Sequence, residues 1–160
     1  MSQKTLLETI DDRAVKTAVL AVVGAHRAIK AANRDKPGTD LTKDDVNVGH
    51  HAIVTTGDTA SEQSILEEIS RRHPDAHVLT EEGGSEQFRS LVVEEKDFDK
   101  LVDYPIVFGI DPIDGSSQFE RELHEWSVSV GVMRNGVHVG GAIYAPDVKG
   151  GLLVAGERGI

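Results

Sequence analysis

The feature that most constrains the fold is an alternating pattern in the last third of the chain. Val128, Val130 and Val132 alternate with serine and glycine, which is the period of a strand with one buried face. The dipeptide Asn135-Gly136 follows and favours the type I′ turn of a β-hairpin. A return strand is predicted over residues 137–144 and, after a turn, a further strand over 152–155. This part of the chain therefore predicts an antiparallel sheet.

The first half of the chain predicts helices. Apolar residues recur at spacings of three and four over residues 5–34, as on one face of a helix. The pair Asp11-Asp12 offers an alternative, in which it caps a second helix after a short first one. A later helix is predicted to begin at Thr59, because the sequence Thr-Ala-Ser-Glu over 59–62 has the pattern of a capping box. Pro74 is predicted to end that helix.

Two shorter strands are predicted between the helices and the hairpin. They cover Val78-Leu79 and residues 104–110, and the charged segment 84–104 between them is interpreted as a surface insertion. Residues 39–55 are interpreted as a loop followed by a short extended piece. We therefore expect an α/β fold of layered type, with helices packed on a mixed, largely antiparallel sheet in one domain of 160 residues.

Acidic residues follow the second of these short strands. Asp111 ends the strand, Asp114 comes three residues later, and Gly115 lets the backbone bend into a helix that starts at Ser116. Two carboxylates beside the amide groups of a helix start suit a metal ion next to an anion. With the carbonyl of Ile113 they supply the oxygen ligands that Mg²⁺ prefers.

The other short strand runs into Glu81-Glu82. If both strands lie in one sheet, Glu81 would share a metal with Asp111, and Asp58 is a third candidate. Taken singly, each element has a plainer interpretation. Asp114-Gly115 is a common turn, the glutamate pair is typical of a surface, and Asp58 suits a helix N-terminus.

Composition limits the functions that this chain can have. The formal charge of −10 disfavours nucleic acid as a partner, and an anionic substrate needs local cations such as Mg²⁺. The chain has no cysteine, which excludes thiolate metal sites and a cysteine nucleophile and favours the cytoplasm. The longest apolar run, residues 18–25, is too short to span a membrane. The seven histidines are scattered and lack zinc-ligand spacing.

The acidic segment also resembles a known signature. Asp111-Pro112-Ile113-Asp114-Gly115-Ser116-Ser117-Gln118-Phe119 resembles that of the inositol monophosphatase family. The superfamily also holds fructose-1,6-bisphosphatases and 3′-phosphoadenosine 5′-phosphate phosphatases. Residues 54–58, 80–82, 126–130 and 141–146 resemble further blocks of the family in the same order. The resemblance runs over most of the chain from about Thr5.

The resemblance implies a role for each candidate residue. Glu81, Asp111 and the carbonyl of Ile113 would hold one metal ion, and Asp111 and Asp114 would hold a second. These roles make Glu81 both a metal ligand and a catalytic residue. The cofactor implied is Mg²⁺.

The same resemblance implies the groups that act on the substrate. Backbone N–H groups of Gly115 and Ser116 would bind phosphate oxygens. Asp58 and Ser116 would orient and activate the attacking water. The chain departs from the family in having Gln118 where Asn is usual and Ser116 where Thr is common.

These residues predict Mg²⁺-dependent hydrolysis of a small phosphate monoester, with inositol monophosphate as the first candidate. Fructose 1,6-bisphosphate and 3′-phosphoadenosine 5′-phosphate are alternatives within that class. A non-catalytic metal-binding or assembly module that keeps the fold is an alternative of another class. We expect the chain to be a truncated or naturally short form, since the family has a further Asp ligand in a C-terminal portion absent here. No membrane partner is expected, and dimerisation, which is common in the family, is left open.

Overall fold

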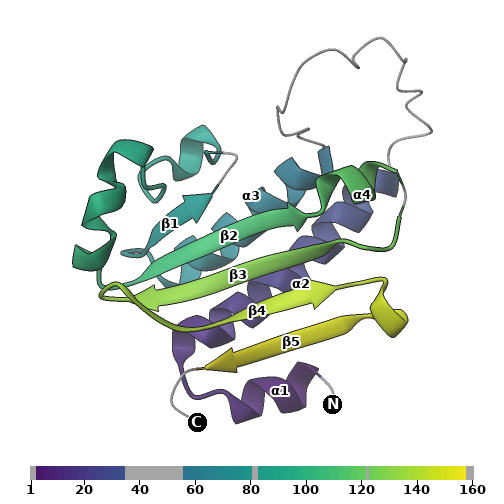
Figure 1. Ribbon diagram of the computed structural model, residues 1–160, viewed down its shortest axis with the longest axis horizontal. Coiled ribbons are helices and arrows are strands. Elements are labelled where there is room, and N and C mark those ends of the chain that lie inside the picture. The colour runs from purple at the N-terminus through teal and green to yellow at the C-terminus, as the bar shows by residue number, and fades with distance from the viewer. Residues whose placement is uncertain (1–2, 35–55, 81–82, 122, 158–160) are drawn as a thin grey trace.

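The computed structural model describes residues 3–34, 56–80, 83–121 and 123–157. Its centre is a five-stranded sheet with the strand order β1-β2-β3-β4-β5. The first two strands are parallel and the other neighbouring pairs are antiparallel. The long helices α2 and α3 lie together behind the sheet, and the face toward the viewer carries no helix of the described chain (Figure 1). The predicted layered α/β fold with a mixed, largely antiparallel sheet is therefore confirmed.

The elements follow one another in a simple order. The strands are β1 (His77–Thr80), β2 (Val107–Asp114), β3 (Ser127–Arg134), β4 (Val137–Ala145) and β5 (Leu152–Glu157). The α-helices are α1 (Gln3–Thr9), α2 (Arg13–Arg34), α3 (Thr56–Arg72) and α4 (Ser116–Glu120). Three 3-10 helices complete the described part: η1 (Glu86–Phe88), η2 (Glu95–Asp103) and η3 (Val148–Gly150). No helix in this part is both long and apolar enough to cross a bilayer.

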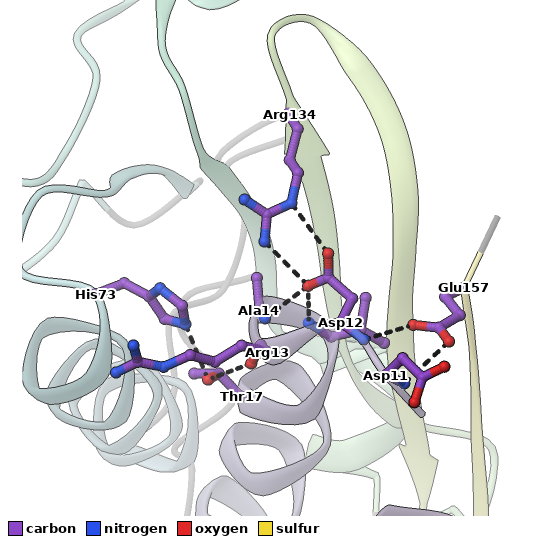
Figure 2. A network of polar contacts seen from close by, with 9 residues as sticks. Asp11, Asp12, Arg13, Ala14, Thr17, His73, Arg134 and Glu157 are labelled. Atoms are coloured by element: carbon purple, nitrogen blue, oxygen red, sulfur yellow. Dashed lines mark hydrogen bonds and ion pairs between the residues drawn. The ribbon is translucent and has the colours of Figure 1, made fainter. Parts of the chain in front are cut away.

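The N-terminal helical region is divided, as the alternative reading of Asp11-Asp12 predicts. Oδ1 of Asp12 accepts hydrogen bonds from the N–H groups of Ala14 at 2.7 Å and Val15 at 3.1 Å, which caps α2. The same carboxylate accepts two hydrogen bonds from Arg134, at 3.0 and 3.2 Å (Figure 2). The carboxylate of Glu157 accepts from the N–H groups of Asp11 and Asp12. The start of α2 is therefore tied to the ends of β3 and β5.

The predicted hairpin is present. Asn135 and Gly136 have φ of 47° and 75°, the two positive values that a type I′ turn requires. Val128, Val130 and Val132 on β3 are buried, while the residues between them are partly exposed. One face of the sheet therefore contributes to the core, together with the apolar sides of α2 and α3.

The segment 84–104 is more than a surface insertion. Leu91 and Val93 are buried, and Val92 forms a parallel bridge with Val78 of β1. The N–H of Val78 donates to the carbonyl of Leu91, and the N–H of Val93 donates to the carbonyl of Val78, at 2.8 and 2.9 Å. The sequence pattern does not reveal this contact, because only three consecutive residues are involved among charged neighbours.

The capping box predicted at Thr59 is wrong. Helix α3 already includes Thr56, so Thr59 lies inside the helix. The side chain of Glu62 does not reach back to the helix start but accepts hydrogen bonds from Thr80 and Gly84. The helix ends at Arg72, as expected from Pro74. The loop and extended piece predicted over 39–55 lie outside the described residues.

Candidate active site

The last four residues of β2 carry two of the predicted ligands on one side of the sheet. Asp111 is paired with Ser129 and Asp114 with Ser127, so the paired positions lie three residues apart in β2 but only two residues apart in β3. In a regular strand, residues three apart point to opposite faces. The extra residue forms a bulge, which brings both carboxylates to the face shared by the two serines. The sequence spacing alone does not reveal this arrangement.

Gly115 turns the chain from β2 into α4. Its φ of 92° is left-handed, and a Cβ at this position would lie 2.9 Å from the carbonyl oxygen of Glu125. Only glycine fits without strain. The turn is closed by the carbonyl of Gly115, which accepts from the N–H groups of Gln118 and Phe119 at 2.9 Å each. The N–H groups that open a helix have no acceptor within it, as the predicted phosphate-binding role of Gly115 and Ser116 requires.

Asp58 and Ser116 come together although they are 58 residues apart in the chain. The Asp58 side chain is buried at 2% exposure, near the start of α3. The hydroxyl of Ser116 lies 3.4 Å from Oδ1 of Asp58 and 2.9 Å from the carbonyl oxygen of Ile113. A serine hydroxyl has one proton and can donate it to only one acceptor at a time. Two of the three predicted catalytic residues, Asp58 and Ser116, therefore lie next to the predicted carbonyl ligand.

Negative charge gathers at this end of the sheet. Asp114 is exposed and accepts from the hydroxyl of Ser127 at 3.4 Å, and no ion pair of the described residues involves it. Burial raises the pKa of Glu120 on α4, and the negative charge of Asp58 raises it further. A cation bound here would relieve that repulsion.

The donor set fits a hard divalent cation. The side chains of Asp111 and Asp114 and the carbonyl of Ile113 offer only oxygen ligands, which Mg²⁺ prefers. The carbonyl of Ile113 has two lone pairs, so its bond with Ser116 leaves one available. Glu81 and Glu82 lie outside the described residues, and within the described ranges no three acidic or histidine side chains converge on one position.

Two polar residues of α3 contact the strand ends, and sequence reasoning missed Ser61 and misassigned Glu62 to a capping box. Ser61 donates to the carbonyl oxygen of Pro112 at 2.6 Å. Glu62 accepts from the hydroxyl of Thr80 at 2.5 Å and from the N–H of Gly84 at 3.3 Å. The only available signal was that both polar residues share a helical face with Asp58, three and four residues earlier.

A cavity of about 540 Å³ opens beside the end of β1, between that strand and the segment 84–104. Thr80 and Gly83 line it together with Arg89, Glu94 and Phe98. None of the predicted site residues that the structure describes lines it. The acidic turn, which we define as residues 111–116, therefore does not line this cavity.

The comparisons with known proteins agree on one family. The sequence profile of the inositol monophosphatase family matches residues 8–159. A Nus factor SuhB of Pasteurella multocida is 37% identical over 93 residues, which are 58% of this chain and 30% of that protein. An inositol-1-monophosphatase of Synechocystis is 33% identical over 94 residues, 59% of this chain and 28% of that protein.

Solved structures share the fold. The inositol monophosphatase of Anabaena superposes with a TM-score of 0.63 at 25% identity, covering 92% of this chain and 44% of that one. The matched part of this chain thus spans less than a third of the two curated relatives, at 30% and 28% of their length.

Proposed function

This chain belongs to the inositol monophosphatase family, and we propose that it carries the metal-binding and water-activating edge of a Mg²⁺-dependent phosphate monoesterase. The observation that supports this most is the bulge at the end of β2. It sets Asp111 and Asp114 on one face beside the contact between Ser116 and Asp58. The relative named inositol-1-monophosphatase makes inositol monophosphate the first substrate to test.

Four residues would hold the metal: Glu81, Asp111, Asp114 and, through its carbonyl, Ile113. A divalent cation bound there lowers the pKa of bound water and neutralises charge that develops on phosphate oxygens. A small phosphorylated metabolite fits this chemistry better than a nucleic acid polymer, given the net charge of −10. We place the activity in the cytoplasm and assign it no membrane partner.

The chain's own residues would manage the proton and the phosphate. The buried carboxylate of Asp58 would accept a proton from water held by the hydroxyl of Ser116. The N–H groups of Gly115 and Ser116, at the start of α4, would bind phosphate oxygens. The Ser116 hydroxyl is also bonded to the carbonyl of Ile113, so the water site and the metal site would be coupled through one side chain.

The test is Mg²⁺-dependent phosphate release from inositol 1-phosphate, fructose 1,6-bisphosphate and 3′-phosphoadenosine 5′-phosphate. Asp114→Asn removes one ligand charge from an exposed position and should lower turnover by about 100-fold or more with the fold intact. Asp99→Asn makes the same change on the exposed surface of η2 and should leave turnover unchanged. Turnover of Asp114→Asn equal to that of the wild type would rule out Asp114 as a metal ligand.

A non-catalytic assembly role is the second candidate. It is favoured by the relative named Nus factor SuhB, which is 37% identical over its matched segment. It would be supported if the chain bound Mg²⁺ but released no phosphate from any of the three substrates.

A further inference from the structure

Three polar side chains on one face of α3 are buried against the sheet. Asp58, Ser61 and Glu62 stand at spacings of three and four, so they lie on the same side of the helix. Their exposures are 2%, 0% and 6%. Buried polar groups destabilise a fold unless they are hydrogen-bonded. The hydrogen-bond partners of these side chains therefore show which groups this face of the helix keeps in position.

Ser61 holds the bulge of β2. Its hydroxyl donates to the carbonyl oxygen of Pro112 at 2.6 Å. Pro112 lies between Asp111 and Asp114, where the pairing with β3 shifts register. A backbone carbonyl in a bulge loses its regular ladder partner, and Ser61 supplies a replacement.

Glu62 holds the end of β1. A single oxygen, Oε1, accepts from the hydroxyl of Thr80 at 2.5 Å and from the N–H of Gly84 at 3.3 Å. Thr80 is the last residue of β1, and Gly84 has a left-handed φ of 69°. The carboxylate therefore joins two residues on either side of the segment 81–83, which includes Glu81 and Glu82.

We infer that Ser61 and Glu62 are positioning residues that fix the end of β1 and the bulge of β2 relative to one another. They are consecutive on one rigid helix, and each is bonded to a different strand end. Asp58, one turn earlier, contacts Ser116 from the same face. The start of α3 thus sets the separation between the Asp111–Asp114 bulge and the end of β1 at Thr80. The consequence for metal binding rests on the proposed function.

Burial energy alone does not account for these two residues. The same helix places Ile65, Leu66 and Ile69 in the core at 0% exposure each. A buried carboxylate is costly compared with an apolar side chain of similar size. Its position is therefore better explained by the two groups that it holds than by the stability of α3.

The experiment is titration of the 160-residue chain with Mg²⁺, followed by calorimetry, together with turnover and thermal unfolding. Ser61→Ala and Glu62→Ala should each weaken Mg²⁺ binding by about 10- to 100-fold. Glu67→Ala, an exposed carboxylate on the same helix, is the matched control and should bind as the wild type does. Glu62→Gln keeps an acceptor oxygen and should bind Mg²⁺ more tightly than Glu62→Ala does. The glutamine variant also provides the test if Glu62→Ala does not fold.

Hydrogen exchange at the Gly84 amide gives a readout that needs no activity. Loss of its acceptor in Glu62→Ala should speed exchange there, while Ser61→Ala leaves it unchanged. If the variants lose only thermal stability and bind Mg²⁺ within two-fold of the wild type, the positioning role is overturned. If the wild type itself neither binds Mg²⁺ nor releases phosphate, the proposed function fails, and this inference fails with it.

Discussion

At the scale of single residues, Gly115 is the position where the acidic turn tolerates least change. Gly115→Ala would combine a left-handed φ of 92° with a Cβ 2.9 Å from the carbonyl oxygen of Glu125. Strain of this kind costs about 1–2 kcal/mol, and a clash with backbone adds to it. We expect the free energy of unfolding in urea to fall by about 2–4 kcal/mol.

Gly150→Ala separates the two effects. Gly150 also has a left-handed φ, of 83°, but no heavy atom lies within 4 Å of the added Cβ. This variant should pay only the conformational cost, about 1 kcal/mol. Equal losses at the two glycines would contradict the close approach of Glu125 to the turn.

Residues also show how far sequence reasoning reached at the site. The cluster from Asp111 to Ser116 was predictable because its turn, carboxylates and helix start lie in one short segment. The bulge was not, because it depends on the register with Ser127 and Ser129. Glu62 was misassigned for a related reason: a capping box is a local pattern, whereas its partners belong to β1 and the segment after it.

At the scale of elements, Asp12 decides how α2 begins. Burial would raise the pKa of its carboxyl, but hydrogen bonds from Arg134 and from the N–H groups of Val15 and Ala14 hold that pKa below its ordinary value. Asp12→Ala loses both cap and ion pair and should cost about 1–2 kcal/mol of unfolding free energy. Asp12→Asn keeps a good cap and loses only the pair with Arg134, which is partly exposed, so it should cost less than about 1 kcal/mol.

The pH dependence of that difference has a definite sign. A carboxyl whose pKa is lowered by folding stabilises the folded state above its unfolded pKa, near 4, and loses that contribution as the pH falls through the folded pKa. The gap in unfolding free energy between the wild type and Asp12→Asn should therefore be constant above about pH 5 and shrink below pH 4. A gap at pH 3 as large as the gap at pH 6 would show that the carboxylate's charge is not responsible.

Helix α2 also shows why the sequence alone fits either one or two helices over residues 5–34. The apolar periodicity of residues 5–34 continues through Asp11-Asp12, so it fits one helix or two. The division is decided by the partners of Asp12 and its neighbour in the strands, namely Arg134 and Glu157. Local pattern identified the cap as an alternative, and contacts over more than a hundred residues select it.

At the scale of the whole molecule, the sheet has two unlike faces. Residues 109, 131, 141 and 156 are glycines paired with one another across four strands, from β2 to β5, which makes a band without side chains. The next row across the same face runs through Asp111, Ser129, Ile143 and Val154. The side chain of Asp111 therefore belongs to the face opposite α2 and α3, while the turn that follows it contacts α3 through Ser61 and Asp58. This relation was not predictable from sequence, because it depends on the register of four strands.

Apolar side chains on that face are predicted to govern self-association rather than stability. Ile143 and Val154 are cross-strand partners with exposures of 47% and 53%. The double substitution of both by Thr keeps β-branched side chains in the strands, so the unfolding free energy should change by no more than about 1 kcal/mol. Association detected by sedimentation at high concentration should decrease, because exposed apolar surface favours contact between copies.

Val130→Ala, on the buried face at 1% exposure, is the control. It should lower the free energy of unfolding by about 2 kcal/mol and leave association of the folded chain unchanged. Undiminished association in the double variant would mean that another surface holds the copies together.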